Sequence, residues 1–244
     1  ECSAAGLDVS SLNIISPITK PCLVLCQGAN YRQHMIESGM NPDDKKFNMF
    51  FTKSAGSISG PYDDVVKPNH VKLLDYEVEL GLVIGKDVTS PMKFDDEKLG
   101  EYVAAFVIGN DISARDVQIP QMQFFKGKSY RSFCPLGPVL CLLEPGEIKQ
   151  IHNMNLNLTV NGEVRQQDST ENLVFKPAES LSEFSQVSDM RVGDVVLTGT
   201  PAGCALQVPP PLVVKASGLL PEALKWKIFI KMQSKSEKYL KSGD

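Results

Sequence analysis

Two acidic residues, Glu77 and Glu79, stand inside an apolar stretch that has the pattern of a buried strand. Leu73 and Leu74 precede them, and the apolar residues 80–84 follow. Side chains alternate between the two faces of a strand, so both carboxylates point the same way. Adjacent carboxylates repel each other and are costly to bury, and a divalent cation would offset both effects. The alternative is an edge strand whose glutamates simply face water.

A further carboxylate, Asp111, follows the predicted strand 102–108. A residue at the end of a strand is well placed to meet a ligand held by Glu77 and Glu79. Three carboxylates are hard oxygen donors that suit Mg²⁺, Mn²⁺ or Ca²⁺ rather than a structural zinc. Mg²⁺ usually keeps water or substrate oxygens in its other positions, so such a site would stay open for catalysis. Otherwise Asn110 and Asp111 are ordinary turn residues.

His34 and Glu37 lie three residues apart on a helix that is predicted to start near Asn30. Side chains at this spacing share one helix face and can hydrogen-bond to each other. A histidine that is oriented by a glutamate is a competent general base for water. A solvated helix face with an incidental pair is the alternative.

A group of cations and a turn of small residues are two further candidates. Lys126, Lys128 and Arg131 precede an apolar strand, where a cation could neutralise a substrate carboxylate or an enolate. The turn 198–203, which contains Thr200, offers hydroxyl and N–H groups that can bind an anion. A solvated basic turn and a plain tight turn are the alternatives. The chain has no GxGxxG, GxxxxGK[ST] or GxSxG motif, so nucleotide-binding and serine-hydrolase functions lack support.

The composition is that of an ordinary globular protein. The 244 residues are 42% hydrophobic and 22% charged, which allows one large domain or two small ones. The net charge of −4 gives no reason to expect nucleic acid or an anionic membrane as a partner. No apolar run approaches the ~20 residues that span a bilayer. Six cysteines without a CxxC pair, and first residues unlike a signal peptide, favour a mitochondrial or cytoplasmic location.

Segments rich in valine and leucine and bounded by Gly, Pro, Asn and Asp predict a mainly β or α+β fold. The predicted strands cover 76–84, 102–108, 137–143, 155–160 and 194–197. Asn161 and Gly162 predict a two-residue hairpin turn, and the clearest helix spans 178–187. Between 226 and 232 apolar and polar residues alternate as in a strand, inside a segment at about 213–239 that is expected to be an insertion.

Taken in order, these segments resemble the fumarylacetoacetate hydrolase family, and most closely its small animal members, the fumarylacetoacetate hydrolase domain-containing proteins. The resemblance covers residues 21–213. It rests on the segments 28–37, 60–63, 77–80, 111–116, 127–130, 134–138, 161–164 and 197–203. Two departures from the family pattern are Tyr130, where Phe is commoner, and Arg131, where relatives often carry Asp.

The resemblance implies a mixed β-sandwich roll, usually a homodimer, that holds one Mg²⁺ or Mn²⁺. It implies that the metal ligands are Glu77, Glu79 and Asp111. It also implies a water-activating dyad of His34 and Glu37 on a lid over the substrate. The residues that it implies around the oxygens of the substrate are Arg115, Gln118, Lys128 and Thr200, with Lys53 close by.

The function implied by the resemblance is metal-dependent hydrolysis of a carbon–carbon bond in an acylpyruvate or a related β-diketo acid. An enolate would form next to the cation, with Lys128 as the partner of an oxyanion. Oxaloacetate decarboxylation and keto–enol tautomerisation are alternatives on the same site. A catalytically silent binding or scaffold protein is the alternative of another class.

Two parts of the chain are expected. Residues 1–20 would be a lead-in, the remnant of an N-terminal region, and residues 21–244 the catalytic domain with its insertion. The last residues resemble the turn before the final strand of the family, so that strand is expected beyond Asp244 in a longer chain.

Overall fold

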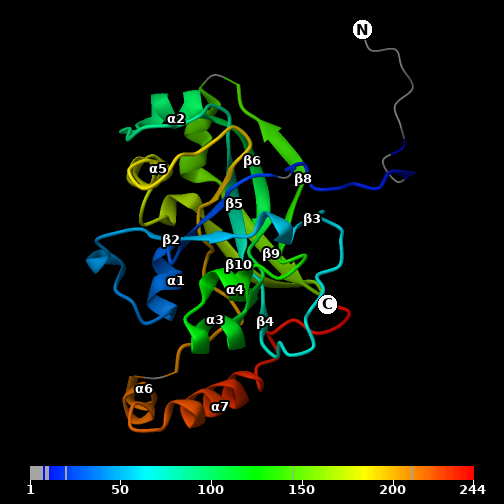
Figure 1. Cartoon of the computed structure of the whole chain (residues 1–244), viewed down its shortest axis with the longest axis vertical. Coiled ribbons are helices and arrows are strands. Elements are labelled where there is room, and N and C mark those ends of the chain that lie inside the picture. Colours follow the sequence, from blue (N-terminus) through cyan, green and yellow to red (C-terminus); the bar gives the residue numbers. More distant parts are fainter. Residues whose placement is uncertain (1–7, 9–10, 20, 145, 210) are drawn as a thin grey trace.

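The computed structural model describes residues 8, 11–19, 21–144, 146–209 and 211–244. These residues form an α+β fold in which a curled mixed sheet carries helices (Figure 1). In this part of the chain the sheet has seven strands, in the order β2 (Met49–Lys53), β1 (Val24–Gly28), β11 (Val195–Leu197), β5 (Val78–Ile84), β6 (Val103–Asn110), β8 (Cys134–Leu142) and β3 (Ile58–Ser59). β1 pairs with β11 and β3 with β8 in parallel, and the other neighbours are antiparallel. The predicted α+β fold is confirmed.

Two further strand pairs lie outside the main sheet. β9 (Asn155–Val160) and β10 (Glu163–Ser169) form a hairpin, and β4 (Leu74–Asp75) pairs with β7 (Ser113–Ala114). Asn161 and Gly162 make the hairpin turn with φ values of 52° and 81°. This is the left-handed conformation that a type I′ turn requires, so the predicted hairpin is confirmed.

The α-helices in the described part of the chain are short, except for the last. In order they are α1 (Arg32–Glu37), α2 (Asp96–Tyr102), α3 (Arg115–Gln121), α4 (Phe124–Lys128), α5 (Pro177–Phe184), α6 (Pro211–Ser217) and α7 (Glu222–Gln233). α1 begins close to the predicted start near Asn30. α5 occupies the place of the predicted helix 178–187 but ends earlier, at a C-cap on Ser185.

Strand β5 lies in the middle of the sheet, between β11 and β6, and all of its residues are buried. Leu80 and Leu82 belong to the same core cluster as Phe184 of α5. Val83 belongs to a second cluster with Val107 of β6. A strand buried on both faces gives its polar side chains no access to bulk water, so any acid on it needs a partner from the protein or from a ligand.

The strand-like pattern expected between 226 and 232 is wrong, because this segment belongs to helix α7. α6 and α7 (orange in Figure 1) lie at the end of the molecule opposite α2. Phe229 and Ile230 pack against a core cluster that includes Tyr76, and Gln233, one turn further on, is buried. A helix satisfies its backbone hydrogen bonds internally, whereas a strand at this distance from the sheet would have no neighbour to pair with.

None of the helices in the described ranges combines the length and the apolar character needed to cross a lipid bilayer.

Candidate active site

The register of β5 and β6 brings the three predicted acids together. Asp111 donates its backbone N–H to the carbonyl oxygen of Glu77 at 2.8 Å, directly after β6 ends. Glu79 pairs with Gly109 across the ladder. A Cβ atom at Gly109 would lie 2.9 Å from the side-chain ends of Leu136 and Leu197, so a larger residue there would force these leucines to move. The carboxylates of Glu77, Glu79 and Asp111 are buried, and one oxygen from each lies within 4.8 Å of the others.

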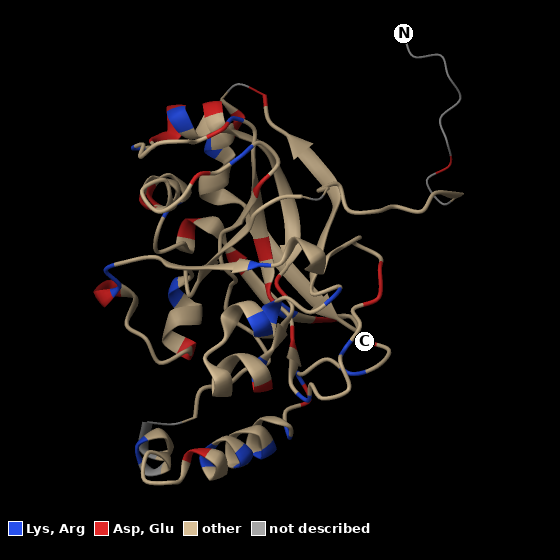
Figure 2. Cartoon of the chain, viewed as in Figure 1, with Lys and Arg blue, Asp and Glu red and all other residues tan. Residues whose placement is uncertain are grey.

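Three buried cations surround these acids (Figure 2 shows red segments on the central strands, above the blue segment of α4). Lys128 Nζ lies 2.6 Å from Glu77 Oε2, contacts Asp111 Oδ2 and donates to Ser113 Oγ at 2.9 Å. Lys53 forms an ion pair with the other oxygen of Asp111. Arg115 contacts Glu77 Oε1. The three cations therefore hold two of the three acids, Glu77 and Asp111.

Glu77 and Glu79 differ in charge because their partners differ. Burial alone would raise the pKa of Glu77, but Arg115 and Lys128 outweigh it and hold the pKa well below its usual range. For Glu79, burial raises the pKa strongly, and the charges of Asp111 and Glu77 raise it further. Its hydrogen bond in the described structure comes from a neutral donor, the backbone N–H of Gly199 at 2.8 Å. Lys128 offsets part of this shift, but among the described residues no cation forms a hydrogen bond or an ion pair with Glu79.

This donor set fits a hard dication. Carboxylate oxygens are the ligands that Mg²⁺, Mn²⁺ and Ca²⁺ prefer. A cation among Glu77, Glu79 and Asp111 would also supply the positive charge that Glu79 lacks, and a bound cation reverses the effect of like-charged neighbours on a pKa. The three predicted ligands therefore form a cluster that could bind a metal.

His34 reaches the same place from α1. It is half-buried, and one of its ring nitrogens lies within 4.8 Å of a ligand atom of Glu77. Burial lowers the pKa of His34, and the opposing charge of Glu77 does not cancel the shift. The imidazole is therefore neutral at neutral pH, the form that can accept a proton.

The expected hydrogen bond between Glu37 and His34 is absent from the described structure. Glu37 is exposed, and its Oε2 accepts from the backbone N–H of Gly203 at 3.2 Å. Gly203 has a φ of 104° and belongs to the turn region after β11. This backbone donor competes with the imidazole for the carboxylate, so the predicted dyad is not formed as a bonded pair.

A cavity of 230 Å³ joins most of these side chains. Of the predicted site residues, its walls include His34, Glu77, Glu79, Arg115, Gln118, Lys128 and Thr200. Apolar walls come from Met49, Phe51 and Phe124. Sites for drug-sized ligands are commonly about 300–1,000 Å³, so this volume suits a smaller molecule.

Two predicted substrate residues have other contacts as well. Lys53 is not part of the cavity wall described above, since its ammonium lies against Asp111 and the carbonyl oxygen of Ile112 at 3.3 Å. Thr200 Oγ1 donates to the carbonyl oxygen of Val78 at 3.0 Å and accepts from Gln166 at 2.8 Å. Its hydroxyl proton is therefore committed to the protein, and it can offer a ligand only a lone pair.

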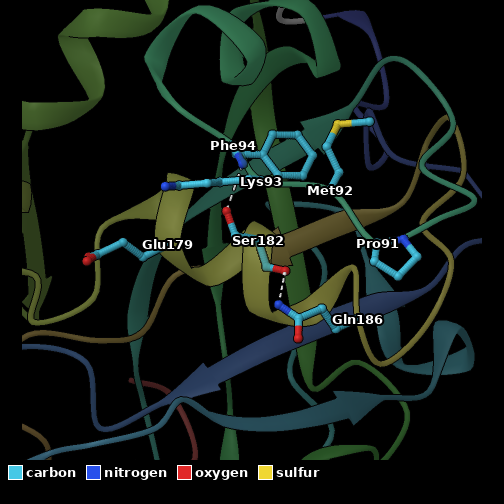
Figure 3. A pocket seen from close by; sticks show the side chains of 7 residues that line it. All are labelled: Pro91, Met92, Lys93, Phe94, Glu179, Ser182 and Gln186. Carbon is cyan, nitrogen blue, oxygen red and sulfur yellow. Dashed lines mark hydrogen bonds between the residues drawn. The ribbon is translucent and has the colours of Figure 1, made fainter.

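A larger hollow of 630 Å³ lies elsewhere and lacks such chemistry (Figure 3). It is lined by Pro91, Met92, Lys93, Phe94, Glu179, Ser182 and Gln186. Ser182 Oγ accepts from the backbone N–H of Phe94 at 2.8 Å, so its oxygen already has a structural partner. Lys93 and Glu179 are exposed. No buried titratable side chain is among the residues that line this hollow.

Two buried residues of the site were missed by the sequence reasoning. Asp75 accepts from Arg115 Nε at 2.8 Å and from the backbone N–H groups of Ala205 and Leu206 at 2.7 and 3.0 Å. It thereby ties the guanidinium to the chain after β11. Its place two residues before Glu77 was an available signal.

The second, Gln166 of β10, accepts from the backbone N–H of Val78 at 2.9 Å and donates to Thr200 and to the carbonyl oxygen of Pro201. Nothing in the sequence around Gln166 marks it, because every one of its partners is distant in the chain.

Comparison with known proteins gives a consistent result. Residues 23–244 match the family model described as fumarylacetoacetate hydrolase, C-terminal. The chain is similar to oxaloacetate tautomerase FAHD2A, mitochondrial, of Homo sapiens, with 39% identity over 208 residues, 84% of this chain and 64% of that protein. It is also similar to oxaloacetate tautomerase YisK of Bacillus subtilis, with 36% identity over 211 residues, 85% of this chain and 68% of that protein.

Among solved structures, the fold matches a 5-carboxymethyl-2-hydroxymuconate delta-isomerase from Mycobacterium smegmatis. The TM-score is 0.70 and the identity 29%, over 84% of this chain and 77% of that chain. The matching part spans 64% of the length of the rat, bovine and human relatives.

Proposed function

Because the chain belongs to the fumarylacetoacetate hydrolase family, we propose that it is an enzyme that interconverts the keto and enol forms of oxaloacetate or a closely related keto acid. Similar proteins from mammals and from Bacillus carry the name oxaloacetate tautomerase. The observation that supports this function best is the meeting of a neutral imidazole, an unpaired buried acid and two buried cations around one small cavity.

The charges of the site favour an anionic substrate once a dication is present. The acids are Asp75, Glu77, Glu79 and Asp111, and the cations are Lys53, Arg115 and Lys128. With every acid ionised, this described cluster carries one negative charge in excess. A dication changes the excess to one positive charge, which would attract the carboxylates of a keto acid into a cavity where water screens poorly.

Glu77, Glu79 and Asp111 would hold the cation, for which we propose Mg²⁺, with Mn²⁺ as the nearest substitute. When bound, it would polarise the keto oxygen of the substrate and so acidify the neighbouring carbon.

The side chains of the cavity would bind the acid and move its proton. Arg115 Nη1 donates to Gln118 Oε1 at 2.9 Å, so the pair presents a fixed polar surface to a substrate carboxylate. A ring nitrogen of His34 would take the proton from the carbon next to the keto group and pass it to the enolate oxygen, and in the reverse direction it would carry the enol proton back to that carbon. Burial would lower the pKa of Lys128, but Asp111 and Glu77 raise it, so its ammonium stays charged and can stabilise an enolate oxygen.

Tautomerisation accounts better for Glu37 than hydrolysis does. Hydrolysis of an acylpyruvate, which the family resemblance implies, needs a water molecule activated by His34 with Glu37 as its partner. Glu37 instead accepts from Gly203, and a proton transfer needs only the imidazole. The names of the similar proteins also favour the tautomerase alternative over the hydrolase. We also propose that the protein is a homodimer and that it is mitochondrial, as the names of the mammalian relatives say of those proteins.

The test is to add the enol form of oxaloacetate to protein stripped with a chelator and then to restore Mg²⁺. We expect the ultraviolet absorbance of the enol to decay faster with protein and Mg²⁺ than with either alone, without release of pyruvate. Release of pyruvate and CO₂ would instead identify a decarboxylase. Cleavage of acylpyruvates without tautomerisation would identify a hydrolase, and no turnover of any of these substrates would leave a silent binding protein.

A further inference from the structure

One buried nucleophile of the cavity region has no role in the proposed reaction. Cys204 follows β11, and its Sγ lies 3.9 Å from Glu77 Oε1. A ring nitrogen of His34, a carboxylate oxygen of Glu77 and the sulfur of Cys204 all lie within 4.8 Å of one another. Three different elements of the fold therefore bring an imidazole, a carboxylate and a thiol to one point.

This donor set differs in kind from the three carboxylates beside it. Sulfur and imidazole ligands suit Zn²⁺ and similar borderline-soft ions, whereas Mg²⁺ prefers oxygen. Zn–S bonds of about 2.3 Å and Zn–N bonds of about 2.0 Å in a tetrahedron place ligand atoms about 3.5 Å apart. The distance between Cys204 Sγ and Glu77 Oε1 is close to this value, and a ring nitrogen of His34 lies within 4.8 Å of the sulfur and of a carboxylate oxygen of Glu77.

We propose that His34, Glu77 and Cys204 form a second metal site, which takes Zn²⁺ or another thiophilic dication and shares Glu77 with the carboxylate cluster. The two oxygens of Glu77 face different partners. Oε2 accepts from Lys128, on the side of Asp111, whereas Oε1 lies on the side of Cys204. One carboxylate can therefore serve either site.

Metal binding requires changes at two local groups, Arg115 and the Cys204 thiol. Arg115 contacts Glu77 Oε1 and must release this oxygen to the metal. The guanidinium keeps its bonds to Asp75 and Gln118, at 2.8 and 2.9 Å, so it stays in place after that release. The metal replaces the proton of the Cys204 thiol, which leaves to solvent as the sulfur becomes a thiolate ligand.

The consequence for activity rests on the proposed function, although the metal site itself does not. An ion on His34 would occupy the nitrogen that the tautomerisation needs. Zn²⁺ would therefore inhibit the Mg²⁺ enzyme, with a potency that depends on Cys204.

The direct probe is Co²⁺, which gives a thiolate-to-metal charge-transfer band only when sulfur is a ligand. We expect the metal-free protein to show this band on addition of one equivalent of Co²⁺, and Zn²⁺ to abolish it. Cys204→Ser should lose the band, whereas Cys141→Ser, which removes an exposed thiol of β8, should keep it. No substrate is needed, so the result is independent of the proposed reaction.

His34→Gln tests the second ligand in a half-buried helix position that tolerates a polar side chain. Competition with a chromophoric chelator should give a Zn²⁺ affinity at least about tenfold weaker for this variant. Co²⁺ bound to the wild-type protein without the band, or a band of equal strength in Cys204→Ser, would overturn the proposal. An unchanged Zn²⁺ affinity in His34→Gln would remove the imidazole from the site and overturn it as well.

Discussion

Lys128 Nζ donates a hydrogen bond to Glu77 Oε2 at 2.6 Å, and the same ammonium contacts Asp111. A lysine thus lies between two of the three proposed metal ligands. Its charge compensates these acids directly, whereas the described hydrogen bond of Glu79 comes from the neutral N–H of Gly199. The lysine and a dication therefore act on the same negative charge, which sets the response of the protein to metal.

Replacing Lys128 by Met should make the protein less stable without metal and more responsive to metal. Removing one member of a buried ion pair costs about 3–5 kcal/mol because the partner charge is left uncompensated. A bound dication would restore that compensation, so Mg²⁺ should raise the melting temperature of Lys128→Met more than that of the wild type. Thermal denaturation with and without Mg²⁺ measures both effects.

Lys126→Met is the matched control, since Lys126 lies on the same helix α4 and is exposed. Its metal response should equal that of the wild type. An equal Mg²⁺ response in Lys128→Met and Lys126→Met would show that the ammonium of Lys128 and the metal do not share their acids.

Because Glu37 accepts from Gly203 and forms no hydrogen bond with His34 in the described structure, substitutions of the two residues should have unequal effects. A general base typically contributes about 10²–10⁴-fold to a rate, so His34→Gln should lower kcat for tautomerisation by a factor in this range. Glu37→Gln keeps an amide oxygen that can accept from Gly203, so its loss should be far smaller. Steady-state kinetics of both variants measures this. Equal losses of kcat would show that Glu37 acts together with His34, as the hydrolytic mechanism requires.

Gln166 should matter for stability although it does not line the cavity. Gln166→Leu leaves the backbone N–H of Val78 buried without its acceptor, at a cost of about 1–3 kcal/mol. It also frees the hydroxyl of Thr200 from its donor. Urea denaturation should show the loss of stability, whereas the exposed neighbour Gln167→Leu should leave the midpoint nearly unchanged. Similar midpoints for the two variants would contradict a structural role of Gln166.

The lowered pKa of Lys45 predicts that the free energy of unfolding depends on pH. Its ammonium donates to the carbonyl oxygens of Gly28 and Ala29, just before α1. Burial lowers the pKa of Lys45 from the ordinary value of 10.5 to about 8, although the charge of Glu183 opposes the shift. Between these values the unfolded chain binds the proton more tightly than the folded chain, so stability rises with pH across this window.

The comparison that checks this prediction is between the wild type and Lys45→Met. The difference in their unfolding free energies should be constant below pH 8 and should move in favour of the wild type from pH 8 to 10.5. The exposed neighbour Lys46→Met controls for the loss of a surface charge. A difference that stays constant across the whole range would show that the pKa of Lys45 is the same in both states.

The carboxylate cluster could be predicted from sequence because it depends on local rules. The period of two along 76–84 put Glu77 and Glu79 on one face, and the break after Asn110 marked the end of the neighbouring strand. The antiparallel register then joined them, with Gly109 opposite Glu79. Nothing beyond strand geometry was needed for these three side chains.

Other features depended on contacts that sequence does not encode locally. Glu37 was at the right spacing for His34, but the N–H of Gly203, far along the chain, is its bonded partner. Gln166 acquires its role only where β10 meets the start of β5. In the tail, the residues 226–232 alternate as in a strand, yet they lie on helix α7, which packs against the distant cluster around Tyr76.

Binding of Mn²⁺ tests the central claim most directly. The electron paramagnetic resonance signal of free Mn²⁺ is lost when the ion binds, so it measures binding of a hard cation without any substrate. The metal-free chain should bind one Mn²⁺ per chain, Mg²⁺ should compete for it, and Glu79→Gln should bind at least about tenfold more weakly. Unchanged Mn²⁺ affinity in Glu79→Gln would mean that the buried acids do not hold the ion, and the proposed chemistry would then lack its centre.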